Sequence, residues 1–327
     1  MPVLNVAFVG TEELARKLGK KGDVRDIESY VHKETVEGDV RILSLLRPLR
    51  HPERLRPLLS VLNVAKAGIV EITAVDAALG EVLVAFGAAR IHNGHAIISP
   101  KNGEWIDADQ VKMILSQAGL ETWTMHEAVP DEHTLRESLL SNVEVEEQKG
   151  PLVIPIDQHF NVKGVGLVAI GYVQSGTVNK HDEVIILPAK ETGVVRSLQV
   201  MDDDVDSAIA GDRVGVALRN LREEALHRGC MIIHPESQAL NRHDNSKIKI
   251  KNAPFQKRKL TTEDVIHAAV DLQFVVGRIK QVDGEIIYVE WENPLWIRAE
   301  GSPEILITQL DAMPMRIIGR VETIEQS

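Results

Sequence analysis

The chain has 327 residues, a formal net charge of −11 and one cysteine, and these figures exclude several classes of protein. At about 150 residues per domain, the length predicts two or three domains. A single cysteine leaves no disulfide framework and no cysteine-based zinc site. The longest apolar stretch, residues 67–91, is interrupted by Glu71, Asp76 and Glu81, and the first residues lack a basic segment before an apolar core. We therefore expect a cytoplasmic protein with neither a secretory signal nor a membrane span.

The first part of the chain alternates short apolar runs with segments of helical spacing. Strands are predicted at residues 3–9, 41–46, 69–75, 95–99 and 121–125. Helices are predicted at residues 11–20, 76–89, 107–118 and 131–140. Asp107 is a suitable N-cap for the third helix, and Gly119 stands just past its end. This alternation predicts an α/β domain at residues 1–149, in which helices flank a parallel sheet.

The pattern changes after a charged segment at residues 141–150, which we interpret as a linker. From there, short strand-like runs are separated by turns about every 8–12 residues, which is typical of an antiparallel barrel. A second polar stretch occupies residues 234–259, and it is followed by further strand-like runs at 265–280, 285–290, 294–300 and 317–323. The sequence therefore predicts two antiparallel β-barrel domains after the α/β domain, at residues 150–235 and 236–327.

The strongest pattern lies at residues 162–188 (VKGVGLVAIGYVQSGTVNKHDEVIILP) and continues through 194–232. Glycines such as Gly176 and Gly211 stand where strands must turn. Together these residues resemble the second domain of the translational GTPases, and they are most similar to elongation factor Tu and the selenocysteine-specific elongation factor. The resemblance implies a P-loop NTPase-like GTPase domain at residues 1–149. It also implies a barrel that contacts a charged tRNA or the ribosome. His181 departs from the pattern, because the family usually has a turn glycine there.

The P-loop of that family, G-x-x-x-x-G-K-[ST], surrounds phosphates with backbone N–H groups, and its Lys and hydroxyl contact the phosphates and Mg²⁺. Here Gly10 matches the first glycine. Ala15, Arg16 and Lys17 stand in place of the second glycine, the Lys and the hydroxyl. The intervening residues include two glutamates, which would repel phosphate oxygens.

The two remaining nucleotide motifs are also altered. In the D-x-x-G-H motif, Arg47 replaces the Asp that holds Mg²⁺ and Arg50 replaces the Gly that senses the γ-phosphate, while His51 keeps the position of the water-positioning His. Lys101 matches the Lys of N-K-x-D, but the Asp that reads guanine is absent. We therefore expect a pseudo-GTPase with no catalytic residue, no metal site and no resident cofactor, for which GTP and Mg²⁺ are disfavoured.

Two basic segments stand out in this acidic chain. Arginines at residues 41–56 form either a solvated helix face or an anion-binding surface. Residues 242–259 form either a polar linker or a basic RNA-binding strip. The candidates for contact with RNA or a partner are Arg54, Arg56, Arg242, Lys247, Lys249, Lys251, Lys257, Arg258 and Lys259.

The interpretation that joins these observations is a translation elongation factor-like pseudo-GTPase, similar to the selenocysteine-specific factor. Its expected partners are tRNA, the ribosome or a protein, with no membrane or DNA partner. Two alternatives stay open. One is a divergent GTP-binding factor that keeps weak GTPase activity through Arg16 or Lys17. The other is a protein–protein scaffold with no RNA role.

Overall fold

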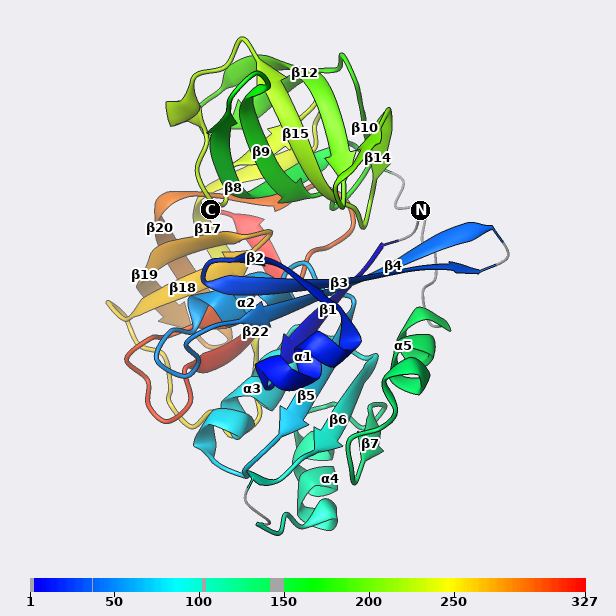
Figure 1. The fold of residues 1–327 in the computed structure, drawn as a ribbon. Coiled ribbons are helices and arrows are strands. Elements are labelled where there is room, and N and C mark those ends of the chain that lie inside the picture. The colour runs from blue at the N-terminus through cyan, green and yellow to red at the C-terminus, as the bar shows by residue number, and fades with distance from the viewer. Residues whose placement is uncertain (1–2, 37, 102–103, 142–149) are drawn as a thin grey trace.

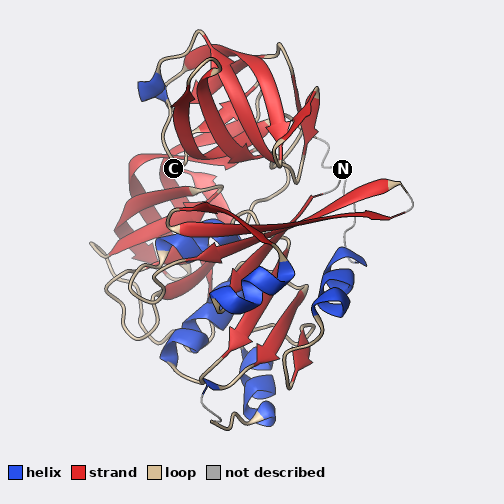
Figure 2. Ribbon diagram, viewed as in Figure 1, coloured by secondary structure: helices blue, strands red, loops and turns tan. Residues whose placement is uncertain are grey.

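The computed structural model describes the chain apart from residues 1–2, 37, 102–103 and 142–149. Nearly all of the predicted linker at residues 141–150 lies outside the described residues. Figure 1 shows an α/β domain beside two barrels, and Figure 2 shows that the α-helices belong to the first domain while the barrels are built of strands. Among the described residues, no helix combines the length and the hydropathy needed to cross a bilayer.

The first domain contains a seven-stranded sheet in the order β2-β3-β4-β1-β5-β6-β7. Its strands are β1 (Val3–Val9), β2 (Lys20–Val24), β3 (Ile27–Val36), β4 (Asp39–Pro48), β5 (Ala67–Ile72), β6 (Gly94–Ile98) and β7 (Thr124–His126). Its helices are α1 (Glu12–Leu18), α2 (Arg56–Leu62), α3 (Ala77–Ala88), α4 (Ala108–Gln117) and α5 (Glu132–Ser141).

The sheet is mostly parallel, not wholly parallel as the alternation predicts. Strands β4, β1, β5, β6 and β7 pair in parallel, whereas β2–β3 and β3–β4 pair antiparallel. No helix separates β3 from β4 in sequence, and a short connection allows only antiparallel pairing. The β3–β4 pair forms a long ribbon that projects from the domain (Figure 1).

Local capping explains where several helices begin. The Thr11 side chain accepts a hydrogen bond from the backbone N–H of Leu14 at the start of α1, and Asp107 caps α4 as predicted. Helix α2 is not among the predicted elements. Pro57 stands at its first turn, and residues 57–62 are all buried, so no amphipathic period marks it.

The first barrel closes through the ring β11-β16-β8-β9-β15-β12, because β11 also pairs with β12. Its elements are β8 (Val153–Val162), β9 (Gly166–Tyr172), β10 (Thr177–Asn179), β11 (Glu183–Leu187), β12 (Glu191–Val200), β13 (Asp203–Val205), β14 (Ser207–Ile209), β15 (Arg213–Arg219), the 3-10 turn η2 (Glu223–Ala225) and β16 (Met231–Ile233). His181 has a φ of 72°, so it adopts the left-handed conformation that a turn glycine would supply.

The second barrel is a closed ring in the order β17-β20-β19-β18-β21-β22. Its strands are β17 (Leu240–Asn252), β18 (Val265–Val270), β19 (Gln273–Asp283), β20 (Ile286–Arg298), β21 (Leu306–Thr308) and β22 (Ile317–Gln326). Strand β17 runs through the polar stretch, so its interpretation as a linker is wrong there. The predicted strand at 265–280 is two strands, since Asp271 and Leu272 turn the chain with φ values of 44° and 62°.

Two glycines of α3 differ in their surroundings and give a matched test of the packing. A Cβ on Gly87 would lie 1.8 Å from the carbonyl oxygen of Ala118, whereas a Cβ on Gly80 would meet nothing within 4 Å. We expect Gly87→Ala to lower the free energy of unfolding by about 1–3 kcal/mol because it overpacks the contact between α3 and α4. Gly80→Ala should raise it by about 0.5–1 kcal/mol through helix propensity. Urea unfolding measures both, and an equal effect of the two substitutions would contradict this packing.

Candidate functional site

The parallel strands bring the sequence-predicted nucleotide positions to one edge of the sheet. Gly10 directly follows β1, Arg50 and His51 follow β4, and Lys101 follows β6. The carboxyl ends of these strands meet at the edge where open α/β sheets bind their ligands. Lys101 itself is exposed there.

Arg47, at the end of β4, binds Gly10, the residue that corresponds to the first glycine of the P-loop motif. Its Nε donates to the carbonyl oxygen of Gly10 at 2.7 Å, and its Nη1 donates to Oε2 of Glu28 at 2.7 Å. The residue in the motif position of the Mg²⁺-binding Asp is thus a cation that joins β4 to the turn after β1. It is also paired with a carboxylate from β3.

Glu28 is the centre of this network. The residue is only 5% exposed, and its carboxylate also accepts hydrogen bonds from Lys21 Nζ at 2.8 Å and from Tyr30 Oη at 2.9 Å. Burial by itself would raise the pKa of Glu28. The hydrogen bonds from Lys21, Tyr30 and Arg47 outweigh burial, so the pKa lies below its ordinary value and Glu28 is ionised. Lys21 also donates to Oε1 of Glu12 at 2.8 Å, which extends the network to α1.

A second carboxylate binds a backbone N–H group next to Gly10. Oε2 of Glu71, at the end of β5, accepts the backbone N–H of Thr11 at 2.6 Å. A Cβ on Gly10 would lie 2.8 Å from Cβ of Glu71, so glycine is needed for this approach. In a working P-loop such N–H groups face phosphate. Sequence reasoning missed this role of Glu71, although an acid in the apolar strand β5 was a visible signal.

Of the altered P-loop positions on α1, Arg16 joins this network only indirectly, through Glu12, which Lys21 also binds. Ala15 is fully buried in the core of the domain. Arg16 pairs with Glu12 at 2.6 Å and Lys17 pairs with Glu13 at 3.0 Å, each one helical turn apart on an exposed face. Hydrogen bonds from Lys21 and Arg16 lower the pKa of Glu12 to about 2.

His51 binds Glu81, which in turn binds a residue of the second barrel. Its Nε2 lies 3.0 Å from Oε2 of Glu81 on α3, and Oε1 of Glu81 accepts hydrogen bonds from Nε and the backbone N–H of Arg316 at 2.9 and 3.0 Å. Burial acts to raise the pKa of Glu81, yet hydrogen bonds from Arg316 and His51 lower it to about 2. This buried cluster, His51–Glu81–Arg316, joins the first domain to the second barrel, and we call it the domain latch.

The other predicted arginines of this region are dispersed. Arg41 and Arg47 lie on β4, so the helix-face interpretation is wrong for these two. Arg50 and Arg54 are exposed in the loop before α2. Arg56 begins α2, and its guanidinium carbon lies 5.6 Å from the ring centre of Phe274 in the second barrel.

The second basic segment is an ordered strand followed by a loop. Lys247, Lys249 and Lys251 alternate with inward residues along β17. Lys247 lies 5.7 Å from the ring centre of Tyr288, and Lys249 pairs with Glu285 at 2.7 Å. The remaining candidates divide into paired arginines and exposed lysines: Arg242 (with Asp244 at 2.7 Å), Arg258 (with Asp264 at 3.4 Å), Lys257 and Lys259.

The domain latch predicts an acid-sensitive stability. Because the pKa of Glu81 is about 2 in the folded chain and ordinarily 4.5, ionised Glu81 stabilises the fold above pH 4.5, and this stabilisation disappears as the pH falls toward 2. We expect Glu81→Gln to lower the free energy of unfolding at pH 7 by about 3 kcal/mol. The difference from the native chain should shrink on acidification. The control is Glu121→Gln, at an exposed position. Urea unfolding across pH checks this, and a pH-independent difference would contradict it.

Comparison with known proteins agrees with this architecture. Residues 166–233 match the family model of elongation factor Tu domain 2. The selenocysteine-specific elongation factor of Methanocaldococcus jannaschii is 31% identical over 53% of this chain and 41% of its own length. The crystal structure of translation elongation factor SelB from Methanococcus maripaludis covers 100% of this chain and 80% of that one, with a TM-score of 0.79 at 20% identity.

A further relative matches almost end to end. Uncharacterized protein MJ0325 of Methanocaldococcus jannaschii is 33% identical over 86% of this chain and 88% of its own length. The chain therefore belongs to the family of MJ0325, and it is a relative of the translational GTPases of the elongation factor Tu and SelB type.

Proposed function

We propose that the chain is a pseudo-GTPase of the translation-factor type, which binds RNA, the ribosome or a partner protein and does not hydrolyse GTP. The observation that carries this proposal is the contact of Arg47 with Gly10 and Glu28, supported by the contact of Glu71 with the N–H of Thr11. Glu71 thus accepts an N–H group that a phosphate would need, and Arg47 is held at the turn where the phosphates would lie.

The contacts of Arg47 and Glu71 are energetically more favourable here than a bound nucleotide would be. A phosphate at the N–H of Thr11 would have to displace Glu71, which carries the same sign of charge. Withdrawing Arg47 would remove one of the two cations that pair with the buried Glu28, the other being Lys21 at 2.8 Å, and loss of a partner from a buried ion pair is destabilising. Mg²⁺ would also lack its usual ligands, because Lys17 and Arg47 stand at the hydroxyl and carboxylate positions.

The binding role rests on two observations of different kind. Relatives that share part of the chain are named as selenocysteine-specific elongation factor and elongation factor 1-alpha. In addition, Lys251, Lys257 and Lys259 are exposed along β17 and the loop after it, where Phe255 is 55% exposed. Exposed cations beside an aromatic ring suit a nucleic-acid strand, through phosphate contact and base stacking.

Nucleotide binding is tested by isothermal titration with GTP and GDP in Mg²⁺, with elongation factor Tu as the positive control. We expect no Mg²⁺-dependent heat at nucleotide concentrations up to ~1 mM, which corresponds to less than about 4 kcal/mol of binding. No phosphate release should follow when ribosomes are added. Micromolar, Mg²⁺-dependent and guanine-selective binding would refute the pseudo-GTPase proposal. Turnover that Arg16→Ala abolishes would instead support the weak-GTPase alternative.

The RNA role is tested by the double variant Lys257→Glu/Lys259→Glu. We expect its affinity for tRNA to fall at least tenfold, and the slope of log affinity against log salt to become shallower, because phosphate contacts release counterions. The control is Lys112→Glu/Lys20→Glu, with the same charge change on the first domain. If both double variants lose the same affinity for tRNA, the effect comes from net charge alone, and this would contradict the RNA site. Capture of proteins alone, insensitive to RNase, would favour the scaffold alternative.

A further inference from the structure

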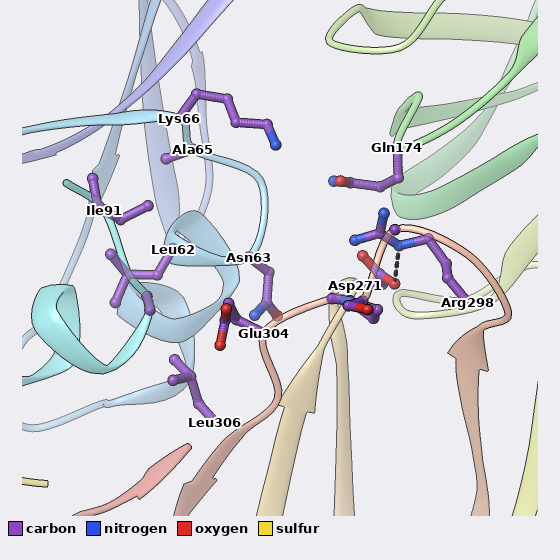
Figure 3. Close-up of a pocket in the computed structure, with 14 residues that line it drawn as sticks. Leu62, Asn63, Ala65, Lys66, Ile91, Gln174, Asp271, Arg298, Glu304 and Leu306 are labelled. Atoms are coloured by element: carbon purple, nitrogen blue, oxygen red, sulfur yellow. Dashed lines mark hydrogen bonds and ion pairs between the residues drawn. The ribbon is translucent and has the colours of Figure 1, made fainter. Parts of the chain in front are cut away.

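A polar cavity of about 140 Å³ lies where the three domains meet (Figure 3). Lys66 borders it from the first domain, Gln174 from the first barrel and Arg298 from the second. Nε of Arg298 donates to Oδ2 of the buried Asp271 at 2.9 Å, so this ion pair forms one wall. Since a water molecule takes about 30 Å³ of liquid, the cavity by itself has room for only a few waters.

A larger hollow of about 570 Å³ adjoins this cavity. Arg298, Ser302, Pro303 and Glu304 line both, so the two hollows lie on either side of the loop between β20 and β21. A volume of roughly 300–1,000 Å³ is typical of small-molecule sites. We call this hollow the arginine groove, after the four arginines that line it: Arg90, Arg242, Arg298 and Arg320.

Four arginines and two carboxylates line the arginine groove, and two of the arginines also pair with carboxylates that do not line it, Arg242 with Asp244 at 2.7 Å and Arg298 with Asp271 at 2.9 Å. The four arginines follow α3 or lie on β17, β20 and β22, and the carboxylates lining the groove are Glu304 and Glu322. Glu304 is shared, because its Oε1 lies 3.3 Å from Arg90 and its Oε2 lies 3.6 Å from Arg320. Charge-assisted hydrogen bonds are usually about 2.7–2.9 Å long. One carboxylate at these distances leaves both guanidinium groups with donors for another anion.

The same groove has an aliphatic side. The partly exposed Ile324 lines it together with Ile297, Ile305 and Val321, which are each at most 9% exposed. A ligand that fits both sides carries an anion that guanidinium forks can bind and a flat, weakly polar body that packs on aliphatic carbons. A nucleotide has these two parts. Neither Gly10 nor any residue of its network lines the groove, so this site is separate from the eroded P-loop.

We propose that the arginine groove is a second ligand site, which binds the phosphate monoester of a free nucleotide or of an RNA end. The phosphate lies among Arg90, Arg242 and Arg320, and the nucleoside packs against the aliphatic side. Each guanidinium group has five N–H donors, so Arg90, Arg242 and Arg320 keep donors for a phosphate beside their pairs with Glu304 and Asp244.

The test measures binding of three probes to the full chain in low salt with EDTA, which removes any Mg²⁺-dependent contribution of the P-loop region. The probes are inorganic phosphate, a nucleoside monophosphate and a 5′-phosphorylated RNA tetranucleotide, with the 5′-hydroxyl RNA as reference. The variants are Arg242→Gln, Arg320→Gln and Glu304→Gln. The control is Arg278→Gln, because Arg278 pairs with Glu263 at 3.5 Å elsewhere on the same barrel.

We expect Arg242→Gln and Arg320→Gln each to weaken binding about tenfold, as loss of a charge-assisted hydrogen bond predicts. Glu304→Gln should strengthen binding severalfold, because it removes the competing carboxylate, and Arg278→Gln should leave binding unchanged. Thermal unfolding verifies that each variant is folded. Tighter binding of the tetranucleotide identifies an RNA end, and tighter binding of the monophosphate identifies a free nucleotide. The proposal is overturned if no probe binds at ~1 mM, or if Arg278→Gln weakens binding as much as the groove variants do. It is also overturned if the 5′-phosphorylated and 5′-hydroxyl RNAs bind equally well.

Discussion

The buried carboxylate of Glu28 is the interaction on which the candidate nucleotide site depends. It accepts hydrogen bonds from Lys21 on β2, Tyr30 on β3 and Arg47 on β4, so it ties three neighbouring strands to one charge. Without Arg47 there would be no cation to bind the carbonyl of Gly10. Without Glu28, Arg47 would be an unpaired charge that is only partly exposed.

The β2–β3 hairpin links this site to the first barrel. Beyond Lys21, Asp23 accepts hydrogen bonds from Gln158 at 2.9 Å and Arg213 at 3.1 Å, and Asp26 at the turn pairs with Arg228. The domain latch makes the corresponding link to the second barrel. Ion pairs therefore join the first domain to both barrels, partly exposed at the first barrel and buried at the second, and each uses only residues of the chain. In the proposed account, the arrangement of the domains does not depend on a bound nucleotide.

Much of the fold could be predicted from the sequence, because apolar runs mark its strands and helices and turn residues mark their ends. The α/β alternation, the Asp107 cap and the barrel strands around Gly176 and Gly211 are of this kind. Other elements carry no such periodicity. Strand β2 is mostly exposed, α2 is buried on all sides, and β17 alternates lysines with few large apolar residues, so local patterns could not identify them.

The chemistry of the candidate site was predictable only in part. Altered motifs indicate that Arg47 and Ala15 replace functional residues, but not what these side chains contact. The pairing of Arg47 with Glu28 and of Glu71 with Thr11 depends on strand order, which brings residues from separate strands together. Glu81 shows the same limit, because its partner Arg316 is more than 200 residues away and belongs to another domain.

A crystal structure of the chain grown with excess GTP analogue and Mg²⁺ tests the central claim most directly. The account predicts Arg47 on the Gly10 carbonyl, Glu71 on the Thr11 N–H, and no nucleotide density between them. Phosphate density on the Thr11 N–H, with Arg47 and Glu71 displaced, would contradict it.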